Sequence, residues 1–371
     1  MLADLWAESS LIVNGGLSHN EPAWQRARQS RKTIFMPTPV WHPDSLAARR
    51  PFLDRRARLT QETRQFFHSR GYTEVETPYA VPAPGEEVHL RPFATTREHP
   101  DGRREQLWLH TSPEFAMKRL LVGGVGPIFQ FARVWRNGEA SATHAPEFTM
   151  LEWYHPGAGM DALIAETTDL LRAVLPPVVT CRGVRTDLSR VECLTLQESF
   201  ARHIGVDLLA IGEDAPTLAA AANARLRDGE TWEDLFFRLL LERIEPHLGR
   251  DCPTFLTHWP AAQAALARRD AADPRVAERF ELFVCGIELA NAFVELTDAI
   301  EQRARFEADR RRRSELTGPD WALDEDFLAA LAHGMPPSAG IALGFDRLAM
   351  IASGADRIAQ VLWLPPPDLV L

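Results

Sequence analysis

The chain has 371 residues, 45% of them hydrophobic and 25% charged, which is enough apolar material to bury one large core. Its 41 basic and 51 acidic residues give a formal net charge of −10 at pH 7, which argues against a protein that holds nucleic acid mainly by neutralising phosphates. Because the four cysteines form no CxxC pair, and because no apolar run reaches the roughly 18 residues of a membrane span, we expect a reducing, cytoplasmic setting without zinc, disulfides or a membrane partner.

Residues 1–43 show little periodicity and contain several prolines and a basic run, so we interpret them as a poorly ordered N-terminal extension. From Ser45 to Arg70, apolar residues recur with helical spacing, and Gly71 ends the run in the manner of a helix cap. The pattern predicts one long amphipathic helix that opens a single folded domain over residues 44–371.

Short strand-like runs follow this helix: TEVETP, QLWLH, PIFQFARVW and EFTMLEWY. Helical periodicity returns in 160–175, 195–204, 216–227 and 232–248, which indicates a helical insertion over about 158–250. Strand character resumes at 253–259 and 279–289, before a strongly charged helix at 298–316 and a final strand and helix over 340–354. Strands interrupted by a helical block, without regular alternation, favour an antiparallel α+β core.

The segment 129–154 carries the strongest chemical signal. Two strand-like arms flank a polar link of about ten residues, which predicts a long hairpin. With a period of two, Phe148, Glu152 and Tyr154 share one face of the second arm, while Arg136 lies at the end of the first. An arginine, an aromatic ring, a carboxylate and a phenol can together hold a phosphate, stack on a base and bind an amine. An amphipathic hairpin with solvated charges is the alternative interpretation.

Two further segments place charged residues within apolar runs. GIALGFDRLAMIASG indicates a buried strand entering a helix, with Arg347 in the first turn, where the helix dipole disfavours a cation. A ligand-binding role or a surface arginine would each explain that position. GIELANAFVELTDA places Glu288, Asn291 and Glu295 in an apolar stretch, where carboxylates need partners. Magnesium with nucleotide phosphates would supply them, and so would structural salt bridges.

Together these segments resemble the signature motifs of class II aminoacyl-tRNA synthetases of the lysyl type. GYTEVETPYAV resembles motif 1, VWRNGE with HAPEFTMLEWY resembles motif 2, and ALGFDRL resembles motif 3, while TSPE and ELANAFVEL match further lysyl-type motifs. The match runs in order over about residues 44–365. It implies a class II catalytic core, an antiparallel sheet flanked by helices with a helical insertion, and a homodimer built around motif 1.

The resemblance implies ATP and Mg²⁺ as cofactors. Arg136 would hold the ATP α-phosphate, Phe148 and Arg347 would sandwich the adenine, and Arg136 and Arg347 would be the catalytic residues. The complete set of implied ATP-binding residues is Arg136, Asn137, Glu139, His144, Phe148, Glu288, Leu289, Gly344 and Arg347. Glu288 and Glu295 would bind the metal, although one of them could instead face the substrate amine.

The amino-acid pocket implied by the resemblance is acidic at two places. Ser112 and Glu114 would receive the backbone amine, and Glu152 with Tyr154 the distant ammonium, so the substrate would be a diamino acid. The complete set of implied substrate-binding residues is Ser112, Pro113, Glu114, Glu152, Tyr154, Asn291, Glu295 and Ala342. An asparagine-type pocket would instead need a cation near the distal site.

Motif 2 departs from the lysyl pattern at two positions. Gly138 stands where a glutamate is usual, with Glu139 one place later, and Ala145 stands where asparagine is common. Both positions normally help to bind ATP. We expect Glu139 to replace the missing carboxylate, since Arg136, Phe148 and Arg347 all remain.

The acceptor is not expected to be tRNA, because a lysyl-tRNA synthetase carries an N-terminal barrel of on the order of 100 residues that grips the anticodon. The motif 1 helix begins near residue 45, which leaves no room for it. This architecture resembles the EpmA family, also called GenX or PoxA, which transfers (R)-β-lysine from its adenylate to a lysine ε-amine of translation elongation factor P.

That resemblance implies elongation factor P and β-lysine as partners, and no stable tRNA binding. It also implies that Ala342, where lysyl-tRNA synthetases generally have glycine, favours the β isomer of lysine. Two alternatives stay open at this point: a truncated lysyl- or asparagine-type paralogue with another acceptor, and a nucleotide-binding regulator without catalysis.

Overall fold

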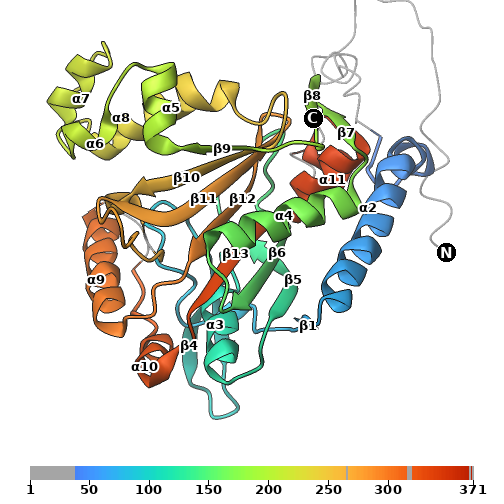
Figure 1. Ribbon diagram of the computed structural model, residues 1–371. Helices are drawn as coiled ribbons and strands as arrows, with labels where there is room; N and C mark the ends of the chain where they lie inside the picture. Colours follow the sequence, from blue (N-terminus) through green and yellow to red (C-terminus); the bar gives the residue numbers. More distant parts are fainter. Residues whose placement is uncertain (1–37, 265, 316–319, 367–368, 370–371) are drawn as a thin grey trace, which may run out of the picture.

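A computed structural model describes residues 38–264, 266–315, 320–366 and Leu369 (Figure 1). Most of the predicted N-terminal extension therefore lies outside the described residues. Its last residue, Pro43, already opens the first described helix, α2 (Pro43–Ser69). None of the helices in this described part of the chain is long and apolar enough to span a membrane.

The centre of the fold is an eight-stranded sheet in the order β1-β5-β6-β13-β12-β11-β10-β9. All neighbours from β5 to β10 pair antiparallel, and only the two outer pairs, β1 with β5 and β10 with β9, are parallel. The predicted α+β class is thus confirmed. The strands are β1 (Thr73–Glu74), β5 (Ile128–Trp135), β6 (Glu147–Pro156), β9 (Glu192–Thr195), β10 (Thr254–Pro260), β11 (Val276–Val284), β12 (Ile287–Val294) and β13 (Ser338–Gly344).

Two small sheets and nine further α-helices of the described chain surround this centre. The small sheets are β2 (Ala80–Val81) with β4 (Arg104–Leu109) and β3 (Phe93–Glu98), and β7 (Val178–Cys181) with β8 (Val184–Asp187). The helices are α3 (Glu114–Val122), α4 (Met160–Val174), α5 (Leu196–His203), α6 (Leu208–Ile211), α7 (Ala215–Ala221), α8 (Trp232–Leu239), α9 (Ala299–Glu315), α10 (Glu325–Gly334) and α11 (Phe345–Ser353).

The long helix α2 confirms the prediction for residues 45–70. Gly71 follows it with a φ of +81°, a backbone conformation that glycine adopts without strain. The apolar residues Leu59, Phe66 and Phe67 of α2 are buried in the chain's own core. The apolar face of α2 is therefore covered within one chain, and the homodimer built around motif 1 stays a prediction.

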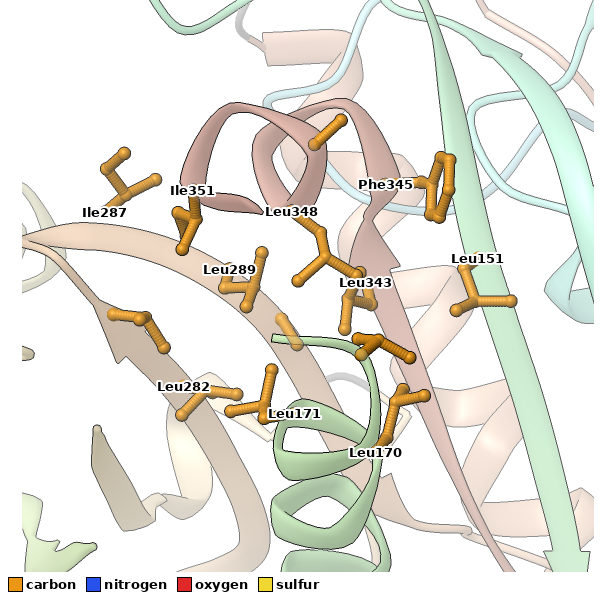
Figure 2. Packing of buried hydrophobic residues seen from close by; sticks show 14 of the residues in the cluster. Leu151, Leu170, Leu171, Leu282, Ile287, Leu289, Leu343, Phe345, Leu348 and Ile351 are labelled. Carbon is orange, nitrogen blue, oxygen red and sulfur yellow. The ribbon is translucent and has the colours of Figure 1, made fainter. Parts of the chain in front are cut away.

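The largest core cluster joins β6, β12 and β13 to helices α4 and α11. Figure 2 shows Leu151 of β6 and Leu343 of β13 packing with Leu170 and Leu171 of α4, beneath Leu348 of α11. All five side chains are at most 1% exposed. A close-packed interior of this kind resists displacement, so it fixes the strands that carry the site.

The predicted insertion needs correction. The range 158–250 is not one helical block, because α4 packs on the main core, β7 and β8 form a small sheet, and β9 joins the edge of the main sheet. The helical lobe proper is α5 to α8, which lies over β9 and β10 (Figure 1) and has a core of its own, including stacked Phe200 and Phe236. Short, β-branched runs such as VVTC pair locally, and helical periodicity does not reveal them.

Two element boundaries also differ from the predictions. The run 232–248 is α-helical only to Leu239 and then continues as a π turn and a 3-10 turn that contains Pro246. The run 279–289 is a hairpin rather than one strand. Its turn lies at Cys285 and Gly286, both with positive φ, and an apolar sequence on both sides of the turn hides it.

Candidate active site

A cavity of about 370 Å³ opens on one face of the sheet and collects most of the residues singled out from the sequence. Its walls come from β6, β11, β12 and β13, the start of α11, and the link between β5 and β6. Twelve of the predicted site residues line it: Ser112, Glu114, Arg136, Glu139, His144, Phe148, Glu288, Leu289, Asn291, Ala342, Gly344 and Arg347.

One row of residues crosses five strands beneath this cavity. In the sheet register Glu281 pairs with Asn291, Asn291 with Ala342, Ala342 with Glu152, and Glu152 with Gln130. Residues directly opposite one another on neighbouring strands lie about 4.5–5.5 Å apart and project to the same face. Segments that are distant in the sequence therefore present their polar side chains side by side.

Glu152 lies at the buried, acidic end of the cavity. It is 1% exposed and accepts hydrogen bonds from Ser112 Oγ at 2.6 Å and from Tyr154 OH at 3.0 Å. Burial, reinforced by the nearby Glu114 carboxylate, raises the pKa of Glu152 to about 8. A buried acid that faces a second carboxylate is a favourable environment for a cationic ligand.

Glu295 lies next to this group, just beyond the end of β12. Its Oε2 is 2.5 Å from Lys118 Nζ, while its Oε1 has no hydrogen-bond partner among the described residues. Gly340 makes this arrangement possible, because a Cβ there would collide with the Tyr154 ring and with Glu295 Oε1. A buried carboxylate oxygen without a partner is uncommon, and it calls for a hydrogen-bond donor that the described residues do not supply.

Arg136 lies at the opposite, more basic end, where β5 gives way to the link. Its guanidinium carbon is 5.2 Å from the centre of the Phe148 ring, and its buried Nε has no hydrogen-bond partner in the described chain. Glu139 Oε1 is 4.0 Å from Arg136 Nη1. Gly138, with a φ of +87°, turns the chain so that Glu139 lines the cavity while Gly138 does not.

Arg347 reaches the cavity from the first turn of α11. It donates to the backbone oxygen of Glu288 at 2.7 Å and contacts His144 Nε2, while Glu288 Oε2 lies 3.5 Å away. Burial and the positive charge of Arg347 lower the pKa of His144 to about 4. His144 is therefore neutral near pH 7, and its Nε2 accepts from Arg347 while Nδ1 lies 2.8 Å from Ser141 Oγ.

The start of α11 is itself anchored by a buried ion pair. Asp346, 1% exposed, contacts Arg56 of α2 and accepts from the backbone N–H of Thr149 at 2.8 Å. Arg56 also donates to Thr149 Oγ1 at 3.1 Å. These bonds tie α2, β6 and α11 together beside Arg347, which fixes the direction in which Arg347 points.

Comparison with known proteins agrees with this geometry. The family model for class II tRNA synthetases (D, K and N) matches residues 47–367. This chain belongs to that family. It is also 44% identical over 329 residues, 88% of this chain and 97% of the relative, to the elongation factor P–(R)-β-lysine ligase of Hamiltonella defensa. The ligases of the same name from Salmonella paratyphi B and Salmonella schwarzengrund show the same identity and coverage.

Within this synthetase-family core, the pair Glu288 and Glu295 is not brought together. The two residues are seven positions apart along and just beyond β12, about 23 Å in an extended strand. Glu288 contacts Arg347, whereas Glu295 is paired with Lys118. The prediction that both carboxylates bind one metal is therefore corrected: strand geometry separates them, and only Glu288 lines the cavity.

Five predicted residues lie outside the lining. Glu152, Tyr154 and Glu295 are buried behind it, whereas Asn137 and Pro113 lie outside it for two different reasons. The exposed Asn137 uses its backbone N–H to donate to Arg91 O at 2.7 Å. Pro113 is buried as the N-cap of α3. Its position sets the start of the helix that carries Glu114 and Lys118, so its contribution is to place its neighbours.

The sequence reasoning missed Arg279, Glu281 and Glu87, all of which line the cavity. Arg279 Nη2 is 2.7 Å from Glu281 Oε1, and its Nε donates to Asn291 Oδ1 at 3.1 Å. Burial raises the pKa of Glu281 to about 8; Arg279 opposes this shift, and the Glu288 carboxylate adds to it. The two charged residues within RFELFV are a signal for a site in the sequence, but the run by itself predicts only a strand.

Proposed function

We propose that this chain activates (R)-β-lysine with ATP and transfers it to a lysine ε-amine of elongation factor P. The observation that carries the proposal is the acidic end of the cavity. There Ser112 and Glu114 line the space that Arg136 bounds at the other end. The buried carboxylates of Glu152 and Glu295 lie behind them, Glu152 bonded to Ser112 and Glu295 sharing Lys118 with Glu114. The names of the relatives, at 44% identity over most of both chains, supply the substrate and the acceptor.

The chemistry proposed is two successive displacements. A carboxylate oxygen of β-lysine attacks the α-phosphorus of ATP, the bond to the β-phosphate oxygen breaks, and pyrophosphate leaves. The acceptor amine then attacks the carbonyl carbon of the adenylate and AMP leaves. Arg136 would stabilise the charge that builds on the α-phosphate, and Phe148 with Arg347 would hold the adenine.

The proposed nucleotide end uses the remaining residues as follows. Glu139 would take the place of the carboxylate absent at Gly138, because it lines the cavity 4.0 Å from Arg136. His144 would hold Arg347 in place as a neutral acceptor. Leu289 and Gly344 would form apolar and backbone walls for the base.

Magnesium would be held by Glu281 and Glu288, with Glu295 reassigned to a substrate ammonium. Glu281 and Glu288 both line the cavity. Burial, with a smaller contribution from the Glu288 carboxylate, raises the pKa of Glu281, and a divalent cation would favour its ionised form. Among the described residues, no group of three or more carboxylate, histidine or cysteine ligands is arranged to hold a metal. Phosphate oxygens would therefore complete the coordination, as Mg²⁺ commonly requires.

A homodimer is proposed on the resemblance to motif 1 and on one surface feature. Tyr79, in the segment 71–82, is 42% exposed although it is a large aromatic residue. The neighbouring strand β1 is an edge strand, which leaves one side of its backbone for another chain.

The decisive experiment is mass spectrometry of elongation factor P expressed with and without this protein. We expect one added lysyl group on one lysine only when the protein is present. Pyrophosphate exchange with β-lysine, α-lysine and asparagine separates the alternatives. Exchange with asparagine alone would indicate an asparagine-type paralogue, and no exchange with any of the three would indicate a regulator.

A further inference from the structure

Lys118 lies directly behind the acidic end of the cavity, beside the lining residue Glu114, at a place where a cation is unexpected. Its side chain is 1% exposed on α3, and its Nζ contacts Glu114 Oε1 and lies 2.5 Å from Glu295 Oε2. Lysine is almost never fully buried unless it is paired. A pocket proposed to bind ammonium groups thus already holds one of its own.

The charge of Lys118 is fixed by its partners. Burial alone would lower the pKa of Lys118, but the carboxylates of Glu114 and Glu295 outweigh it and raise that pKa. The Tyr154 phenol stays neutral, because burial and the nearby Glu152 raise its pKa as well. With Tyr154 neutral, the groups around Lys118 that can carry a negative charge are three carboxylates, Glu114, Glu152 and Glu295.

Three carboxylates and one ammonium leave two negative charges when all are ionised. A diamino acid whose carboxylate faces Arg136 brings two ammonium groups to this end, and the charges then cancel. We propose that Lys118 is a built-in counter-ion that sets the amino-acid pocket to two negative charges and so selects substrates with two ammonium groups. This inference rests on the proposed function for the identity of the substrate.

The contacts of Lys118 differ from those of a purely structural lysine. Lys118 leaves hydrogen-bonding capacity in its partners, because the buried Glu295 Oε1 has no hydrogen-bond partner in the described chain. Among the described residues, the donors to the Glu152 carboxylate are the hydroxyls of Ser112 and Tyr154. Lys118 therefore satisfies part of the acidic set and leaves the rest for a ligand.

Charge counting makes an unusual prediction for a double variant. Lys118→Met leaves three carboxylates without an internal cation, and Glu295→Gln leaves two carboxylates with one. Each single change breaks the balance, and we expect each to raise the KM for β-lysine at least tenfold in pyrophosphate exchange. Lys118→Met with Glu295→Gln restores two carboxylates and no cation, so its KM should be several-fold lower than that of Glu295→Gln alone.

Several outcomes would overturn the inference. If the double variant has a KM equal to or above that of Glu295→Gln, Lys118 has no role in charge selection. Lys118→Arg keeps the charge, so its KM for β-lysine should stay within about threefold of that of the wild type. If Lys118→Arg raised this KM as much as Lys118→Met does, the inference would also be overturned. The comparison of the double variant with Glu295→Gln stands even if Lys118→Met fails to fold, because removing both partners of a buried pair is tolerated better than removing one.

Two controls separate this inference from the proposed function. The KM for ATP should stay unchanged in all variants, since neither Lys118 nor Glu295 is among the residues that line the cavity around Arg136. If the wild type exchanges with β-lysine but the double variant raises the KM by the product of the two single effects, only the role of Lys118 is overturned. Absence of exchange in the wild-type protein would overturn the proposed function, and the inference with it.

Discussion

Ala342 on β13 lies directly opposite Glu152 on β6 in the register of the sheet, and its side chain lines the cavity. Its methyl group therefore stands on the same face as the buried carboxylate proposed to bind an ammonium. Asn291 pairs with Ala342 from the other side. The size of residue 342 thus helps to set how closely a substrate approaches Glu152.

This relationship bears on which isomer of lysine is activated. In β-lysine the amine is one carbon further from the carboxylate, so the bound backbone must shift relative to α-lysine. Discrimination by one methyl group is worth about 1–3 kcal/mol. We expect the wild type to activate β-lysine far better than α-lysine, and Ala342→Gly to move the ratio of the two kcat/KM values towards α-lysine by roughly tenfold. An unchanged ratio would mean that Ala342 only packs the strand.

Arg136→Ala should abolish adenylate formation while the fold is kept. The side chain has a buried Nε without a partner in the described chain, so it is placed to donate to an incoming anion. Loss of one such contact in the transition state costs on the order of 3 kcal/mol or more. Pyrophosphate exchange measures the effect, and a thermal unfolding midpoint close to that of the wild type shows that the protein is still folded. Retained exchange would contradict the assigned role.

Glu139→Ala tests the compensation for Gly138. If Glu139 supplies the carboxylate that the motif otherwise has one residue earlier, its removal should raise the KM for ATP by several-fold and leave the KM for β-lysine unchanged. Glu147→Ala is a matched control, because this exposed carboxylate at the start of β6 does not line the cavity. Equal ATP dependence of Glu139→Ala and wild type would show that nothing replaces the missing glutamate.

The acidic end predicts a pH dependence of substrate binding. Glu152 has a pKa of about 8 in the folded protein, raised by burial and by Glu114, against about 4.3 in an unfolded chain. Below pH 8 its neutral form dominates, and a bound ammonium favours the ionised form. The KM for β-lysine should therefore fall by up to tenfold per unit as pH rises from 6 to about 8, while the KM for ATP changes less.

The same shift predicts an effect on stability with the opposite sign. Because the folded pKa is above the unfolded one, the folded protein binds more protons, and the free energy of unfolding falls as pH rises from about 4 to about 8. Glu152→Gln cannot ionise and should escape this loss. The thermal unfolding midpoint of Glu152→Gln, relative to that of the wild type, should therefore rise between pH 5 and pH 8.5. A constant difference between the two midpoints across that range would contradict a buried, titrating Glu152.

Oligomeric state is tested by light scattering at micromolar concentration. We expect a mass of two chains, each of 41.6 kDa. Tyr79→Asp introduces a charge at an exposed position of the segment 71–82 and should shift the equilibrium towards the monomer. A wild-type monomer would contradict the proposal.

Much of the fold and the site could be predicted from the sequence because the signals are local. Helical spacing from Ser45 to Arg70 and strand-like runs around 128–156 give α2, β5 and β6 within a few residues. Alternation along β6 places Phe148, Glu152 and Tyr154 on one face, and the register confirms it by pairing them with Val134, Gln130 and Ile128. A period of two is a property of any strand, so no tertiary information is needed for it.

Partners across strands could not be predicted in this way. Glu288 and Glu295 look equivalent in one apolar run of the sequence. In the folded chain the length of β12 separates them, so that Glu288 contacts Arg347 while Glu295 contacts the buried ammonium of Lys118. Lys118 itself gives no local signal, because a lysine four residues after a glutamate on a helix is usually a solvated pair. The sequence by itself determined which residue types gather at the site, whereas the packing of α3 against the end of β12 decided their charges and partners, because burial and distance exist only in the folded chain.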